Sequence, residues 1–85
     1  MLGLESNQLT TLPESFGQLR ALDNLDLHNN QLTTLPASFG RLLALTELDI
    51  AENRFEEMPD TLNALVNLQL LNDRRISSYH INRAR

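Results

Sequence analysis

A seven-residue segment occurs twice in this chain without a single change. The segment NQLTTLP occupies residues 7–13 and returns as residues 30–36. The wider segments 2–21 and 25–44 agree at 14 of 20 positions, and residues 45–67 form a third, more diverged copy. A fixed period of this length indicates a stack of similar units rather than one closed globule. We therefore predict a solenoid in which each copy packs only against its neighbours.

The second copy shows how one such unit is expected to fold. Leu25 and Leu27 alternate with polar residues, which is the pattern of a short strand with one buried face. Asn30 comes where the chain turns, and its amide can bond backbone groups that the bend leaves without partners. Pro36 suits the start of a short helical turn, because a proline lacks the N–H that would be unpaired there. Phe39 on that turn is expected to face the core.

Equivalent apolar residues recur in each copy, and we expect them to form one shared core. Phe16, Phe39 and Phe55 are predicted to lie in this core. No single copy could bury its own apolar face, so the stability has to come from stacking. Three copies are about the minimum for a stable solenoid. The strands of successive copies would then lie side by side in a parallel sheet.

The pattern Leu-x-x-Leu-x-Leu-x-x-Asn-x-Leu, followed by Leu-Pro-x-x-Phe-Gly-x-Leu, resembles the leucine-rich repeat family, and in particular its typical-type 23-residue repeats. The resemblance covers roughly residues 2–71. It implies an α/β solenoid, a short right-handed arc with a parallel sheet of three or four short strands on the concave side. Short helical turns or 3-10 segments would form the convex side. The family resemblance also implies a protein-binding scaffold.

We predict one leucine-rich repeat domain over residues 1–73. Its units are a truncated copy at about 2–21, full copies at 22–44 and 45–67, and a partial copy at 68–73. Two registers fit the last copy, one with Leu68 and Leu71 on schedule and one shifted by three residues. Residues 74–85 show no period and are expected to form an irregular cap or a basic tail. In a cap, the apolar lid would be made by Ile76, Tyr79 and Ile81.

Both ends of the predicted solenoid lack a regular polar cap. At the first copy, the residues expected to show their apolar side chains to water are Leu2, Leu4, Leu9 and Leu12. An open sheet edge pairs readily with another chain. We therefore predict self-association through an exposed end, as a twofold dimer. The alternative is that the chain is a structural fragment of a larger repeat array with no separate ligand.

The charge of the chain is unevenly distributed. All eleven acidic residues lie between Glu5 and Asp73 with only three arginines, which gives −8. The last twelve residues carry four arginines and no acid, and this +4 leaves the net −4 of the whole chain. An acidic body disfavours nucleic acid as a partner. No stretch approaches the ~18 consecutive apolar residues of a membrane span, and cysteine is absent, so we expect a cytoplasmic protein that does not bind membranes.

The residues between the strand leucines are expected to project from the concave side and to form a binding surface. The predicted binding residues are Glu5, Asn24, Asp26, His28, Glu47, Asp49, Glu52 and Asn72. Ala51 is also expected to face solvent. Asp26 and Asp49 would lie roughly 5 Å apart on adjacent strands, where like charges repel unless solvent or a partner's cation screens them. The pattern indicates an acidic patch for a basic segment of a partner protein, or simply a solvated face.

Chemistry other than binding has little support in the sequence. His28, Asp26 and Asp49 are residue types that hold metals, but no ligand spacing recurs, and we predict no metal and no cofactor. The chain has no cysteine nucleophile, no nucleophile elbow and no glycine-rich phosphate loop. We therefore predict no catalytic residues and no enzymatic activity.

Overall fold

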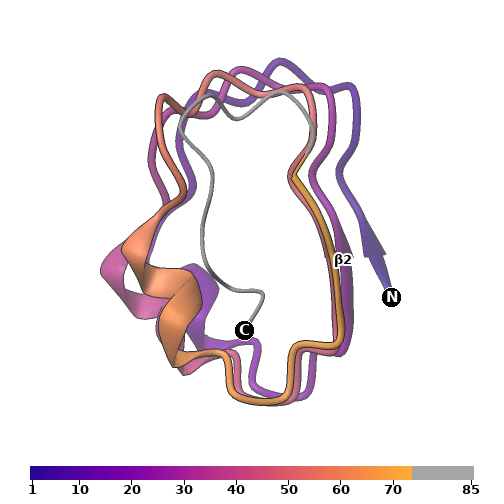
Figure 1. Ribbon diagram of the computed structural model, residues 1–85, viewed down its shortest axis with the longest axis vertical. Coiled ribbons are helices and arrows are strands. Elements are labelled where there is room, and N and C mark those ends of the chain that lie inside the picture. The colour runs from indigo at the N-terminus through magenta and orange to yellow at the C-terminus, as the bar shows by residue number, and fades with distance from the viewer. Residues whose placement is uncertain (74–85) are drawn as a thin grey trace.

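The computed structural model describes residues 1–73 and shows three coils of a solenoid followed by the strand of a fourth. Seen along the shortest axis, the coils lie over one another, with the strands on one side and the helical turns on the opposite side (Figure 1). The predicted cap or basic tail at residues 74–85 lies outside the described residues. Within the described part, no helix is long and apolar enough to cross a membrane.

Each coil contributes one short strand to a parallel sheet whose strand order follows the sequence. The strands are β1 (Leu2–Gly3), β2 (Asn24–Asp26), β3 (Glu47–Asp49) and β4 (Leu70–Asn72). Each residue pairs with the one 23 positions later, so that Leu25 lies beside Leu48 and Leu48 beside Leu71. This pairing puts the last strand in the register that keeps the repeat period. The predicted parallel sheet of a short solenoid arc is confirmed.

The opposite side of the coils consists of three 3-10 turns, and each begins directly after a proline. The turns are η1 (Glu14–Gln18), η2 (Ala37–Arg41) and η3 (Asp60–Ala64). Pro36 stands at the start of its turn, as predicted, but as the residue that directly precedes η2. Its backbone is extended, with ψ 151°, and its carbonyl accepts the Phe39 N–H at 2.9 Å. The turn therefore uses the carbonyl of the proline as its first acceptor, and the missing N–H plays no part.

The core fills the space between the sheet and the turns. Phe16, Phe39 and Phe55 are all buried there, as predicted. The rings of Phe16 and Phe39 stack, with their centroids 5.9 Å apart. Adjacent turns touch so closely at Gly17 that a Cβ on this residue would collide with the carbonyl oxygen of Ser38. Neighbouring coils are thus in van der Waals contact at both the sheet and the turns.

The first coil is less exposed than the sequence predicted. Leu2, Leu4 and Leu9 are partly buried, in line with an end coil that has a neighbour on one side only. Leu12, which was expected to face water, is buried. The reason is that Leu12 belongs to the same buried cluster as Phe16.

A column of asparagines ties the coils together at the turns that follow the strands. The Asn30 Nδ2 donates to the carbonyls of Leu4 and Leu27, both at 2.9 Å. Its Oδ1 accepts the N–H groups of Asn7 and Leu9, also at 2.9 Å. Asn30 therefore links the second coil to the first, and the predicted role of this amide is confirmed. The end of β2, from which the candidate site projects, is fixed by these bonds.

Candidate functional site

The predicted binding residues project from the strands or follow directly after them. Asn24, Asp26, Glu47, Asp49 and Asn72 are strand residues, whereas Glu5, His28 and Glu52 lie just beyond β1, β2 and β3. We call the surface formed by these eight residues the sheet face. The strand register places Asp26 directly beside Asp49, and Asp49 beside Asn72. The repeat period, which fixes the register, thus also arranges the polar side chains in rows across the sheet.

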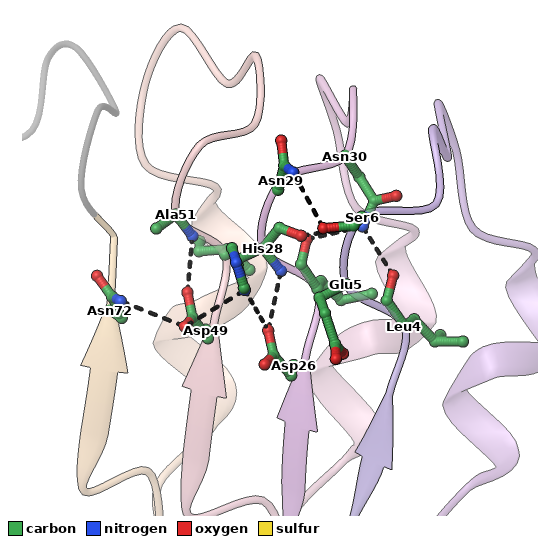
Figure 2. Close-up of polar contacts among 12 residues, drawn as sticks. Leu4, Glu5, Ser6, Asp26, His28, Asn29, Asn30, Asp49, Ala51 and Asn72 are labelled. Atoms are coloured by element: carbon green, nitrogen blue, oxygen red, sulfur yellow. Dashed lines mark hydrogen bonds and ion pairs between the residues drawn. The ribbon is translucent and has the colours of Figure 1, made fainter.

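His28 lies between the two aspartates (Figure 2). Its Nδ1 is 2.9 Å from the Oδ1 of Asp26 and 3.9 Å from the Oδ2 of Asp49. The sequence predicted a repulsive pair of carboxylates, but not that the His28 ring lies between them. The signal was present, because Asp26 and His28 are two residues apart and therefore project on the same side. Asp49 follows Asp26 by one repeat.

Backbone groups hold both carboxylates in place at the strand ends. The N–H of His28 donates to the Oδ1 of Asp26 at 3.1 Å, and the N–H of Ala51 donates to the Oδ1 of Asp49 at 3.1 Å. The two aspartates thus make the same local hydrogen bond in successive coils. Their side chains are fixed by the backbone before any partner arrives, so little rotamer entropy would be lost on binding.

The surrounding carboxylates raise the pKa of His28 above its ordinary value. The main cause is the hydrogen bond from its ring to Asp26, and the negative charges of Asp26, Asp49 and Glu52 act in the same direction. Desolvation opposes this effect by lowering the pKa. The side chain is 37% exposed, so the ring exchanges protons freely with solvent. The charge of the sheet face therefore changes at a higher pH than the titration of an ordinary histidine would give.

Amide side chains flank the carboxylates across the strands. The Nδ2 of Asn24 donates to the Oε1 of Glu47 at 2.7 Å, and the Nδ2 of Asn72 donates to the Oδ2 of Asp49 at 3.2 Å. These bonds run between adjacent strands and orient the acceptor oxygens. They leave the negative charge in place, because an amide is neutral.

A shallow hollow of about 250 Å³ lies over the strands. Its rim carries Asp26, Glu47 and Asp49, together with the apolar side chains of Met1 and Leu70. Leu70 is 59% exposed. A larger hollow of about 520 Å³ is lined by residues 33–35 and 56–61, which lie outside the sheet face. The negative charge of the sheet face therefore lies beside an exposed apolar contact.

A family model described as a leucine-rich repeat region matches residues 1–84 of the chain. The chain is a leucine-rich repeat protein. The resemblance seen in the sequence is thereby confirmed, and it agrees with the parallel sheet and 3-10 turns of the coils. No curated protein sequence matches the chain. Leucine-rich repeat domains are typically non-enzymatic modules for protein interaction.

Ala51, like Leu12, does not lie where the sequence of this leucine-rich repeat domain predicted. Ala51, expected to face solvent, is buried. Its carbonyl accepts the N–H of Asn29 at 3.0 Å and the Nδ2 of Asn53 at 3.2 Å. Together with the bond from its own N–H to Asp49, these contacts draw the residue into the turn. A small side chain fits there, which leaves His28 without a bulky neighbour on the third coil.

The same cluster contains the residue types that could hold a cation. One nitrogen or oxygen atom from each of Asp26, His28 and Asp49 can be chosen so that all three lie within 4.8 Å of one another. In the part of the chain that the structure describes, nothing besides this cluster points to a metal ion. The groups that the leucine-rich repeat domain offers here are fixed carboxylates that can accept hydrogen bonds from a cationic side chain.

Proposed function

We propose that this leucine-rich repeat domain binds a partner protein through the sheet face, and that the partner presents a basic segment. Carboxylates of Asp26, Glu47 and Asp49 lie on two adjacent strands around one hollow. Glu5 and Glu52 extend the negative charge along the turns. A basic segment lying across the strands would meet these carboxylates in succession. Such charge complementarity favours fast and selective association.

The observation that carries this proposal is the direct opposition of Asp26 and Asp49 in the β2–β3 register. Like charges opposite each other on neighbouring strands destabilise a sheet. His28 offsets this repulsion only while it is protonated. An arginine or lysine of a partner would remove the repulsion and gain charge-assisted hydrogen bonds from carboxylates that are already oriented.

Binding fits the shape of the surface better than catalysis does. The hollow over the strands is open, whereas acid–base chemistry needs a group enclosed in a pocket. Leu70 at the rim offers an apolar contact of the kind that buried anchor residues use. We therefore propose a binding module that is not an enzyme and that recognises protein rather than nucleic acid.

The proposal can be tested by calorimetric titration with a synthetic peptide of alternating arginine and alanine residues. The double variant Asp26→Asn plus Asp49→Asn removes two charges and keeps an acceptor oxygen for the His28 and Ala51 N–H groups. We expect its affinity for the peptide to fall about tenfold or more, because both charge-assisted contacts are lost.

The matched control is Glu56→Gln plus Glu57→Gln, which removes the same charge from exposed residues outside the sheet face. We expect this control to bind the peptide within about twofold of the parent protein, since distant charges are screened by salt. Equal losses in the two double variants would mean that the peptide responds to net charge alone, and the proposed site would then be wrong.

A second proposal concerns self-association through the first coil. The edge of β1 that faces away from β2 has no strand beside it among the described residues. The partly buried apolar residues of this coil are Leu2, Leu4 and Leu9. We propose that a second copy of the 85-residue chain covers them, since an open edge accepts a further strand. Sedimentation at tens of micromolar should show a dimer, and a monomer would contradict this proposal.

A further inference from the structure

We propose that a partner's cation and the proton on His28 compete for the place between Asp26 and Asp49, so that binding of the partner expels this proton. The inference rests on the binding function proposed above and specifies how that function is regulated. This competition makes the binding of a basic partner weaker in mildly acidic conditions. Three side chains from two coils, Asp26, His28 and Asp49, meet at this place.

The imidazole nitrogen occupies the position that a partner's cation would need. The Nδ1 of His28 lies 2.9 Å from Asp26 and 3.9 Å from Asp49, and the ring stands over the gap between the two carboxylates (Figure 2). A guanidinium or ammonium group that bridges these aspartates would lie beside the ring, between the same two carboxylates. A protonated ring would repel that group at close range, whereas a neutral ring would not.

Among residues 1–73, the other charged side chains that act on His28 are acidic. Asp26 comes from β2 and Asp49 from β3, and Glu52 lies in the turn after β3. On the side of β1, Glu5 stands one repeat before His28. On the side of β4, the neighbour is the neutral Asn72. In residues 1–73, His28 is thus the one side chain of the sheet face that can carry positive charge.

The direction of the pH effect follows from linkage. The carboxylates raise the pKa of His28 in the free protein, so the ring keeps its proton to a higher pH than an ordinary histidine does. A bound cation lowers the pKa, because it adds positive charge beside the ring. The affinity for a basic partner therefore rises with pH through the range in which His28 loses its proton.

The test is calorimetric titration with the alternating arginine–alanine peptide at about pH 5.5 and about pH 8. We expect binding to be about three- to tenfold weaker at the lower pH, which corresponds to a fall in the His28 pKa of up to about one unit on binding. Near the midpoint of the His28 titration, the measured heat of binding should depend on the ionisation enthalpy of the buffer, because the protein releases protons when it binds the peptide. An NMR titration of the His28 ring with saturating peptide should show the lowered pKa directly.

His28→Asn is the decisive variant, because its amide can still donate to Asp26 but does not titrate. We expect this variant to bind the peptide with nearly the same affinity at both pH values. His80→Asn removes the chain's other histidine and should keep the full pH dependence of the parent protein.

The outcomes separate this inference from the function on which it rests. Binding of the parent protein that does not change with pH, or a pH dependence that persists in His28→Asn, would overturn the inference and leave the proposed function standing. No binding at about pH 8 would overturn the proposed function, and the inference with it.

Discussion

The first and second coils contain the same seven residues, NQLTTLP, in different surroundings. In the second coil, Asn30 is 6% exposed and Leu32 is completely buried. In the first coil, Asn7 is exposed and Leu9 is only partly buried. The difference arises because the second coil has a neighbour on both sides. An identical sequence therefore contributes different amounts of stability, according to the contacts that adjacent coils provide.

The largest expected effect comes from leucines at the same position in these two coils. Leu32→Ala should lower the free energy of unfolding by about 2–5 kcal/mol, because it removes a fully buried side chain and leaves a cavity. Leu9→Ala should lower it by only about 1 kcal/mol, since this leucine is already in contact with water. Denaturant unfolding of both variants measures the difference. Equal losses would contradict the unequal roles of the two coils.

The asparagine column gives the next largest contrast. Asn30→Ala removes a side chain that makes two short bonds as donor and two as acceptor. We expect a loss of about 2–3 kcal/mol, because buried backbone groups are left without partners. Within residues 1–73, the Asn7 side chain donates to the carbonyls of Leu4 and Glu5 at exposed positions. Asn7→Ala should therefore cost less than about 1 kcal/mol, and thermal unfolding followed by circular dichroism can rank the two variants.

A smaller effect on stability is expected at the residue before each asparagine. Here the second coil is compared with the third. Asn29 has φ 61° and Glu52 has φ 58°, so both adopt the left-handed conformation. Asparagine tolerates this conformation better than glutamate does. Glu52→Asn should raise the free energy of unfolding by roughly 0.5 kcal/mol, and Asn29→Glu should lower it by a similar amount. A destabilised Glu52→Asn would show that the Glu52 side chain makes a contact worth more than the strain.

The smallest effect concerns pH and again distinguishes one coil from its neighbours. His28 stands in the second coil, where the first has Glu5 and the third has Ala51. Because folding raises the pKa of His28, its contribution to stability is fully present below the pKa of the unfolded chain. That contribution is lost as the pH rises through the higher pKa of the folded protein. Urea unfolding across this range should show a slight fall in stability with pH that His28→Asn lacks.

This direction is opposite to that of partner binding, which should strengthen as the pH rises. The two measurements together therefore distinguish a histidine that only stabilises the fold from one that also competes with a ligand. A stability that rises with pH through the titration of His28 would contradict the ion pair with Asp26.

The repeat period was enough to predict the sheet, the shared core and the outward-facing rows. Those features depend on spacing alone, and a residue 23 positions later has to lie beside its counterpart. Side-chain detail depends on contacts that the period does not specify. Leu12 is buried through its packing in the Phe16 cluster, and Ala51 is drawn inward by backbone hydrogen bonds. These contacts could not be deduced from the pattern of leucines.

The candidate site was likewise predicted only in part from the repeat period. Its residues and the pairing of Asp26 with Asp49 followed from the register, and the structure has this pairing. The position of the His28 ring did not follow, because it depends on a rotamer that brings Nδ1 toward Asp26. A spacing of two residues between a carboxylate and an imidazole at a strand end was the available sign. This spacing alone did not predict a ring between two carboxylates, because that arrangement also depends on the position of Asp49.

The most direct test of the central claim is to locate a bound basic segment on the protein. Isotope-labelled protein can be titrated with the alternating arginine–alanine peptide while the backbone amide shifts are followed by NMR. We predict that the largest shift changes fall in residues 24–28 and 47–49, which include the two strands that carry Asp26 and Asp49. Changes concentrated instead in residues 56–61, around the larger hollow, would contradict the assignment of the sheet face as the binding surface.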